Sequence, residues 1–309
     1  MNPEAVQNLL ASTGENGPFE LHQLEGGRNN RAFRVQTARN TYFLKAFYPE
    51  SAKMRHTFLR ETGFLRYAGE IGLSRVARLM ATDPEHFLLL SEFVPGKKYA
   101  GQVTDAAIQT AAAWIRELNR SAALPDLEQA ADSCRCNEDH FSGVRKRLQR
   151  FFDLDRTELN PLLQYFECEL NKLEKISQPE CRRQIVSPSD FGFHNVLRSN
   201  GQLYFVDFEY AGLDDPAKLI CDFFCQPDFL ISLAFLPSFV KAAFPDEPNL
   251  LERVEVLLGV HRIKWACILM NPLLPDRAKA RQYSGEALLN FQVVLSRVKK
   301  YYWGDSNES

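Results

Sequence analysis

Side chains rich in acceptor oxygens gather in one short stretch of the sequence, SPSDFGFHNVLRSNGQLYFVDFEYAG, residues 187–212. They are Asp190, Asn195, Asp207 and Glu209. Asn200-Gly201 separates two apolar runs and is a strong signal for a hairpin turn. Such a hairpin would bring Asp190 and Asn195 close to Asp207. Mg²⁺ prefers oxygen ligands of this kind, so the stretch predicts a site for Mg²⁺ and its phosphates, with one carboxylate left to orient or deprotonate a hydroxyl.

The order of residues along the chain narrows this chemistry to phosphoryl transfer. Asp190 and Asn195 have the spacing D-x-x-x-x-N, and an Asp-Phe dipeptide follows at Asp207. Kinases use these three positions for a catalytic Asp and two metal ligands. Kinases also pair a Lys on a strand with a Glu on the following helix. Lys45 in YFLKAF and Glu61 in FLRETGFL have the corresponding positions along this chain. Each signal alone is common by chance, and the prediction depends on their joint order and spacing.

Neighbouring polar residues have simpler explanations. Glu209 suits a structural partner of the hairpin or of the helical lobe better than a metal ligand, and His194 suits packing or a hydrogen bond within the loop. Asp214 and Asp215 precede a Pro and can cap the helix that begins there. In CRCNEDH, residues 134–140, the two Cys and the His lack the usual spacing of a zinc site and have no second ligand pair nearby, so we expect no structural zinc.

The predicted elements change in character along the chain. Three strands are expected between Phe19 and Phe47, a helix over 54–72, and two strands over 76–94 joined at Asp83-Pro84. Beyond Pro95-Gly96 the patterns indicate helices, with residues 187–212 as the one strand-and-turn segment. A small β-rich lobe, residues 1–95, followed by a larger helical lobe, residues 96–309, is the expected division.

Five segments resemble the aminoglycoside phosphotransferase and choline kinase-like superfamily: LEGGRNNRAFRV, YFLKAF, LLLSEFVPGK, SPSDFGFHNVL and YFVDFEYAGLDDPAKL. The resemblance runs from about Glu20 to Asp222. It implies an α+β, protein-kinase-like bilobal fold with a small antiparallel β-rich N-terminal lobe. It also implies an ATP-dependent kinase that phosphorylates a hydroxyl of a small molecule, such as a sugar, an amino alcohol or an aminoglycoside-like acceptor.

The resemblance implies a role for each matched position. Asp190 would be the catalytic base, and Asn195 and Asp207 would hold Mg²⁺. The other positions would contact ATP or support that contact: the turn with Gly27, Asn29 and Asn30 over the phosphates, Lys45 at the phosphates, Glu61 beside Lys45, and the backbone of Glu92 and Val94 at the adenine.

Two positions depart from the family pattern. Pro188 stands where the family usually has the His of H-G-D, and Leu219 stands at the second Asp of D-P-x-x-D, for which Asp222 can substitute from one helical turn further on. Because of these departures, a second function remains an alternative: a catalytically weak or inactive kinase-like nucleotide-binding protein. A protein kinase is disfavoured, because no A-P-E motif and no activation segment follow Asp207.

Composition excludes several other classes of protein. The 309 residues are 45% hydrophobic and 25% charged with a formal net charge of −2, which gives no electrostatic reason to expect nucleic-acid or membrane binding. No signal peptide or membrane span is evident, and the seven irregularly spaced Cys favour reduced thiols in a cytoplasmic protein. The expected partner is a small-molecule phosphoryl acceptor, and its identity and the oligomeric state stay open.

Overall fold

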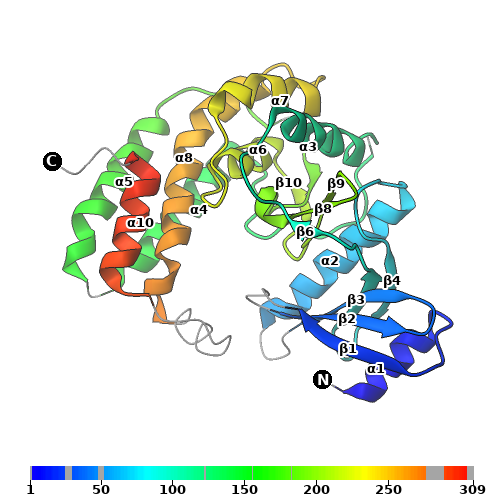
Figure 1. Ribbon diagram of the computed structural model, residues 1–309. Coiled ribbons are helices and arrows are strands. Elements are labelled where there is room, and N and C mark those ends of the chain that lie inside the picture. Colours follow the sequence, from blue (N-terminus) through cyan, green and yellow to red (C-terminus); the bar gives the residue numbers. More distant parts are fainter. Residues whose placement is uncertain are drawn as a thin grey trace. The chain divides into compact units, whose positions relative to one another are not determined.

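The computed structural model describes residues 2–24, 30–47, 52–121, 123–154, 156–181, 183–275 and 289–304 (Figure 1). The chain divides into two compact units, which are described separately. Unit 1 contains residues 1–131 and 188–213, and unit 2 contains residues 132–187 and 214–309. The stretch that carries the predicted chemistry therefore belongs to the same unit as the N-terminal strands. The predicted lobes, residues 1–95 and 96–309, have different boundaries and stay a prediction.

Unit 1 contains an antiparallel five-stranded sheet with the order β1-β2-β3-β5-β4 (Figure 1). The strands are β1 (Phe19–Leu24), β2 (Arg31–Thr37), β3 (Thr41–Ala46), β4 (Leu79–Asp83) and β5 (Leu88–Glu92). They confirm the strands expected from alternating apolar residues. Helix α2 (Ala52–Glu70) connects β3 to β4 and confirms the helix expected over residues 54–72.

Helix α1 (Pro3–Ala11) is an element that the sequence patterns did not predict. Asn2 caps it by accepting a hydrogen bond from the N–H of Glu4 at 3.0 Å, and Pro3 stands in the first turn, where its missing N–H costs nothing. The apolar side chains of α1 join the core of the sheet. This core includes Val6, Leu9 and Leu10 from the helix, with Val35, Leu44 and Leu90 from the strands.

The second part of unit 1 is built on a hairpin. Its elements are β6 (Lys97–Lys98), α3 (Asp105–Leu118), the short helix η2 (Phe193–Asn195), β8 (Val196–Ser199), β9 (Gln202–Phe205) and the beginning of β10 (Gly212–Asp214). Strands β6, β8 and β9 form an antiparallel sheet in that order. The β8–β9 turn has φ values of 50° at Asn200 and 77° at Gly201. Two consecutive positive φ values fit the hairpin turn that this dipeptide predicts.

Trp114 of α3 is the centre of an aromatic cluster inside unit 1. Its indole N–H donates to the backbone carbonyl of Ser74 at 2.9 Å. Four phenylalanine rings surround it, with centroids 4.5 to 6.4 Å away: Phe64, Phe191, Phe205 and Phe208. Because Trp114 is only 1% exposed, the cluster joins α2, α3 and the 188–213 segment into one core.

Unit 2 is largely helical. Its elements are α4 (Asn137–Phe152), η1 (Thr157–Leu159), α5 (Asn160–Leu173), β7 (Ile185–Ser187), α6 (Pro216–Cys225), η3 (Leu233–Phe235), α7 (Leu236–Ala243), α8 (Leu250–Met270), η4 (Asn271–Leu273) and α10 (Phe291–Trp303). Every residue of α6 is buried, and α6 packs along α8. Asp215 caps α6 by accepting from the N–H of Ala217 at 2.7 Å, which confirms the cap expected before Pro216.

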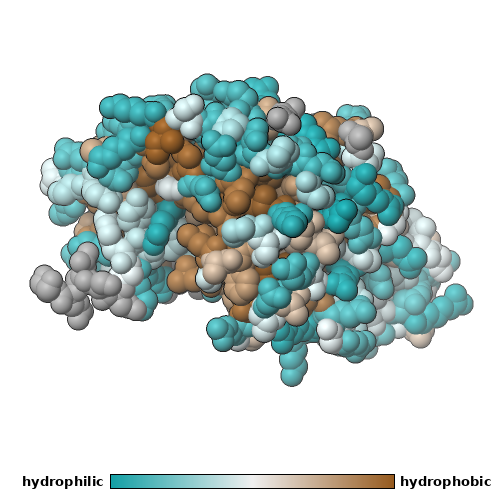
Figure 2. All heavy atoms as spheres, turned by 90° about the horizontal axis from the view of Figure 1, so that it is seen from above, coloured by the Kyte–Doolittle hydropathy of each residue, from teal (hydrophilic) through white to brown (hydrophobic). Residues whose placement is uncertain are grey.

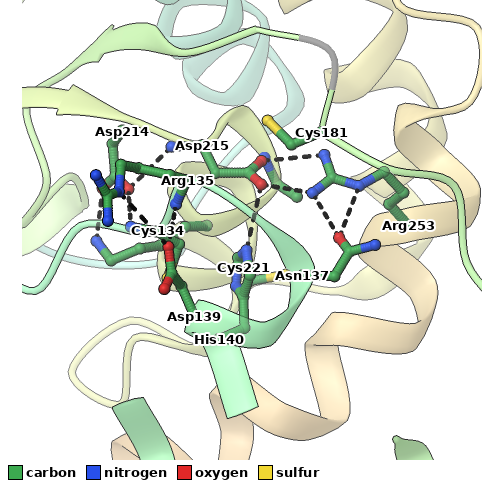
Figure 3. A network of polar contacts seen from close by, with 12 residues as sticks. Cys134, Arg135, Asn137, Asp139, His140, Cys181, Asp214, Asp215, Cys221 and Arg253 are labelled. Atoms are coloured by element: carbon green, nitrogen blue, oxygen red, sulfur yellow. Dashed lines mark hydrogen bonds and ion pairs between the residues drawn. The ribbon is translucent and has the colours of Figure 1, made fainter. Parts of the chain in front are cut away.

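Buried polar groups connect the helices of unit 2. Around Asp215, Arg253 donates to the carboxylate and to Asn137, and the ring of His140 lies 3.3 Å from Asp215 (Figure 3). On its other side, His140 contacts His261 at 2.9 Å. The Nδ1 atom of His261 in turn lies 3.0 Å from the Oδ1 atom of a second carboxylate, Asp222. The two carboxylates are thus linked through two imidazoles.

Burial and the charges of this network shift the pKa of both His261 and Asp222. Burial lowers the pKa of His261 from 6.5 to about 3, although Asp222 opposes the shift. Burial alone would raise the pKa of Asp222, but Lys264, Lys218 and His261 hold it well below its usual value. The neutral imidazole and the ionised carboxylate are therefore the forms that the folded chain stabilises.

Large apolar side chains remain exposed in the segment that leads into α7. Leu230 is 73% exposed and Leu233 is 53% exposed. Figure 2 views the molecule from the side on which α7 lies in Figure 1, and it shows apolar residues among a mostly hydrophilic surface. Single exposed apolar side chains are common on folded proteins and indicate no function by themselves. In the part of the chain that the structure describes, no helix is both long enough and apolar enough to span a bilayer.

Removing the Trp114 side chain should destabilise unit 1. Trp114→Ala should lower the free energy of unfolding by about 3–5 kcal/mol, because a fully buried indole is lost. Trp114→Phe should cost less, since most of the ring volume remains. Urea unfolding followed by circular dichroism measures both, with Leu59→Ala at a 40% exposed position of α2 as the control. Equal losses for Trp114→Ala and Leu59→Ala would contradict the central place of this ring.

The buried imidazole of His261 should make the fold sensitive to acid. As pH falls from 6.5 towards 3, the unfolded chain protonates this group before the folded chain does, so stability is lost across that window. His261→Gln should reduce the slope of unfolding free energy against pH by up to about 1.4 kcal/mol per pH unit. Urea unfolding between pH 7 and pH 5 measures the slope. The exposed His22→Gln serves as the control, and an unchanged slope in His261→Gln would contradict the assignment.

Candidate active site

Lys45 and Glu61 form the buried ion pair expected from the sequence. The Nζ atom of Lys45 on β3 lies 2.7 Å from Oε2 of Glu61 on α2, and the two side chains are 8% and 5% exposed. Lys45 is opposite Ala32 of β2 and Leu89 of β5, so the sheet fixes its position from both sides. The structure therefore joins β3 to α2 through one shielded contact between opposite charges.

Two further carboxylates surround the Lys45 ammonium. Oδ1 of Asp207 lies 2.7 Å from Nζ and Oε2 of Glu209 lies 3.4 Å from it. Burial would lower the pKa of Lys45, but Asp207, Glu61 and Glu209 raise it well above its usual value. The lysine is a cation at any working pH, and three acidic side chains face a single positive charge.

The pKa of Glu61 is raised in this cluster. Burial raises the pKa of Glu61 to about 7 against the opposing charge of Lys45, and Asp207 and Glu209 add to the rise. Carboxylate oxygens of Glu61, Asp207 and Glu209 lie within 4.8 Å of one another. Asp207 has a 45% exposed side chain, whereas the other two are buried. The cluster suits an added divalent cation, and Asp207 is the member open to one.

The backbone at Asp207 is in an uncommon conformation. Its φ is 68°, in the left-handed region that residues other than Gly seldom occupy. This turn follows β9 and lets the carboxylate face Lys45 while the next residue, Phe208, enters the aromatic cluster, with its ring 4.3 Å from that of Phe64. Packing of Phe208 therefore holds the conformation that directs Asp207 to the cluster.

Asp190 and Asn195 come together in the loop before the hairpin. The Nδ2 atom of Asn195 donates to the backbone carbonyl of Asp190 at 3.0 Å and lies 3.4 Å from Oδ2 of the same residue. The backbone carbonyl of Asn195 accepts from the N–H of Val206 at 3.0 Å, next to Asp207. The hairpin thus brings the three predicted positions into one region, as its turn signal indicated.

The remaining predicted positions are less fully described. Asn30 donates from Nδ2 to Oε2 of Glu209 at 2.5 Å, whereas Gly27 and Asn29 lie outside the described residues. Glu92 ends β5, and its N–H donates to the carbonyl of Arg78 at 2.9 Å. Val94 is half-buried just beyond β5. Contacts of these residues with a nucleotide stay a prediction.

Two contacts go beyond the sequence prediction. Glu209 was expected to support the hairpin, and it also lies beside Lys45. His194 was expected to form a loop hydrogen bond, and its Nε2 atom lies 3.2 Å from Oδ1 of Asp190. The sequence gives a weak signal for the contact of Glu209 with Lys45, because Glu209 is an acidic residue two positions after Asp207. It gives no signal that His194, four residues after Asp190 in a loop, contacts the Asp190 carboxylate.

The sheet Lys, the helix Glu, the Asp-Asn loop and the hairpin that ends in Asp-Phe together define a protein-kinase-like phosphotransferase. The chain belongs to the phosphotransferase enzyme family, whose model matches residues 20–242. This match confirms the resemblance stated from the sequence, and the chain is thus a member of a phosphotransferase family. Comparison with proteins of curated function finds no match.

Solved structures of similar fold include choline kinases and antibiotic phosphotransferases. The chain is 15% identical to choline kinase LicA from Streptococcus pneumoniae, with 97% of each chain covered and a TM-score of 0.61. A putative aminoglycoside phosphotransferase from Ralstonia eutropha has 16% identity, a TM-score of 0.65 and coverage of 97% of this chain and 95% of that one. Spectinomycin phosphotransferase, solved with ADP and spectinomycin, has 14% identity and a TM-score of 0.58. The match covers 97% of this chain and 98% of that one. These likenesses confirm the protein-kinase-like α+β fold.

The acidic cluster should bind a divalent cation through Asp207. Asp207→Asn should weaken Mg²⁺ binding by at least about tenfold, because it removes the charge of the exposed carboxylate. Thermal unfolding of the protein at increasing Mg²⁺ concentration measures the affinity. Asp126→Asn, at an exposed carboxylate in the loop after α3, is the matched control and should leave the midpoint unchanged. Equal Mg²⁺ dependence in both variants would contradict a metal site at Asp207.

Proposed function

We propose that this phosphotransferase transfers the γ-phosphoryl group of ATP, with Mg²⁺, to a hydroxyl of a small molecule. The observation that carries the proposal is the arrangement of Lys45 with Glu61 and Asp207, beside the loop of Asp190 and Asn195, within a single unit. Family membership supports the reaction class. Choline kinase and spectinomycin phosphotransferase among the similar structures support an amino alcohol or an aminoglycoside-like acceptor.

Nucleotide binding is assigned to the sheet side of the site. Lys45 contacts the ATP phosphates, and Glu61 restrains its side chain through the 2.7 Å ion pair. The turn that contains Gly27, Asn29 and Asn30 covers the phosphates. The backbone of Glu92 and Val94 meets the adenine at the end of β5. Lys45 is suited to phosphate binding because it remains charged while buried, so its ammonium group is a cation held in one position.

Asn195 and Asp207 are assigned as the residues that hold Mg²⁺. The amide nitrogen of Asn195 is directed to Asp190, which leaves its Oδ1 atom on the opposite side of the amide group. Asp207 contributes a half-exposed carboxylate in a cluster with more negative than positive charge. The donor set therefore fits a hard cation. When bound, Mg²⁺ neutralises charge on the phosphates.

Asp190 is assigned as the group that orients the acceptor hydroxyl and accepts its proton. Its carboxylate is about one-third exposed, so a hydroxyl can approach it, while contacts with Asn195 and His194 restrict its rotation. The reacting oxygen loses its proton to Asp190 as it forms the bond to phosphorus and the bond to the leaving phosphate oxygen breaks. Catalysis then depends on positioning and on charge stabilisation.

Asp190→Asn should separate catalysis from nucleotide binding. Turnover should fall by about 10³-fold or more, because the amide cannot accept the hydroxyl proton, while the Kd for Mg-ATP should change less than about threefold. Wild type is first screened with Mg-ATP and choline, ethanolamine, spectinomycin and simple sugars as acceptors. Asp126→Asn is the matched control. Near-wild-type turnover in Asp190→Asn would contradict the assignment, and Mg-ATP binding without turnover in wild type would favour an inactive kinase-like protein.

A further inference from the structure

His194 contacts the carboxylate assigned as the base from within the same loop. Its Nε2 atom lies 3.2 Å from Oδ1 of Asp190, and the two side chains are 17% and 32% exposed. Asn195 approaches the other oxygen, Oδ2, with its Nδ2 atom at 3.4 Å. Consecutive residues thus contact the two oxygens of one carboxylate. Partial burial strengthens such polar contacts relative to those in bulk water.

The backbone before Asp190 is in an uncommon conformation. Ser189 has a φ of 65°, and the N–H of Asp190 donates to the carbonyl of Pro188 at 3.0 Å, which closes a tight three-residue turn. A positive φ at a residue other than Gly costs of order 1–3 kcal/mol and persists only where surrounding contacts hold it. Pro188 has no N–H with which to support the turn. Contacts made after Asp190 add to those that hold this turn.

The backbone that carries His194 is well anchored. Phe193 is 1% exposed, and its ring centroid lies 4.7 Å from that of Tyr99. On the other side, the N–H of Asn195 donates to the carbonyl of Gly192 at 3.0 Å, closing the short helix η2. The imidazole is thus presented to Asp190 from a rigid turn, as a positioning role requires.

The second ring nitrogen indicates which tautomer is present. Nδ1 of His194 is buried and has no hydrogen-bond partner among the described residues. A buried donor without an acceptor is rarer in folded proteins than a buried acceptor without a donor. The proton is therefore placed on Nε2, where it points to the Asp190 carboxylate. In this form the imidazole donates from Nε2 to one carboxylate oxygen of Asp190.

We propose that His194 is a positioning residue for Asp190. By donating from Nε2 to Oδ1, it holds the carboxylate in the rotamer that presents its remaining lone pairs to the acceptor hydroxyl. His194 keeps its proton throughout, and the hydroxyl proton ends on Asp190. This inference rests on the proposed function, because it assigns His194 a role only if Asp190 is the base. No pattern in the sequence singles out Asp190 as the partner of His194.

Three substitutions separate donation from packing. His194→Gln retains an N–H near the position of Nε2, whereas His194→Ala and His194→Leu remove it, and Leu retains the volume. With Mg-ATP and the best acceptor of the screen, His194→Ala and His194→Leu should each lose about 10²-fold in kcat, the size expected from a misplaced reacting group. The KM for ATP should stay within about threefold of wild type. His194→Gln should recover at least about tenfold over His194→Ala.

Two results would overturn the positioning role. If His194→Leu matched wild type, packing alone would explain the side chain. If His194→Gln were no better than His194→Ala, no N–H donation would be required. His22→Ala, at an exposed histidine of β1, is the control and should keep wild-type kcat.

A spectroscopic measurement tests the contact without relying on turnover. In protein labelled with ¹⁵N-histidine, the His194 imidazole signal is identified by its absence in His194→Gln. Asp190→Asn should shift this signal, and an unchanged signal would overturn the contact. If wild type transferred phosphate to no acceptor but the signal still shifted, the proposed function would fail while the contact stood. If turnover required Asp190 but the signal did not move, the positioning role alone would fail.

Discussion

The packing of phenylalanine rings around Trp114 is the interaction on which the site depends. Phe191 follows Asp190, Phe208 follows Asp207, and Phe64 lies one turn after Glu61 on α2. All three rings contact the same indole. Each acidic residue is thus placed by an apolar neighbour, so the core of unit 1 determines the geometry of its charges. Hydrophobic burial supplies the free energy that holds three acidic side chains in a region where their own repulsion would separate them.

The charges themselves are balanced differently in the two units. In unit 2, Asp215 and Asp222 each have basic partners and are stabilised as buried anions. In unit 1, three carboxylates face Lys45, and burial together with the charges of Asp207 and Glu209 raises the pKa of Glu61. The excess of negative charge in unit 1 is what the proposed Mg²⁺ would balance.

The sequence was most informative where local chemistry decides the structure. Asn200-Gly201 predicted the hairpin because two positive φ values strongly favour that dipeptide, and the order of Lys45 and Glu61 in a kinase-like pattern predicted the ion pair. Features that depend on residues distant in sequence were not predictable. The rings around Trp114 come from separate segments. The positive φ of Ser189, next to Asp190, was not predictable either, because Ser carries no signal for it.

The interleaved make-up of the two units has a consequence for synthesis of the protein. Unit 1 requires residues 188–213, yet residues 132–187 of unit 2 are made first, and unit 2 in turn awaits residues beyond 213. A nascent chain on the ribosome therefore cannot complete its first unit until about two-thirds of the protein has emerged. Until then Lys45 lacks Asp207, and Phe64 and Trp114 lack Phe208. Folding order is thereby imposed by connectivity, and a protein expressed as its N-terminal part alone would lack the site.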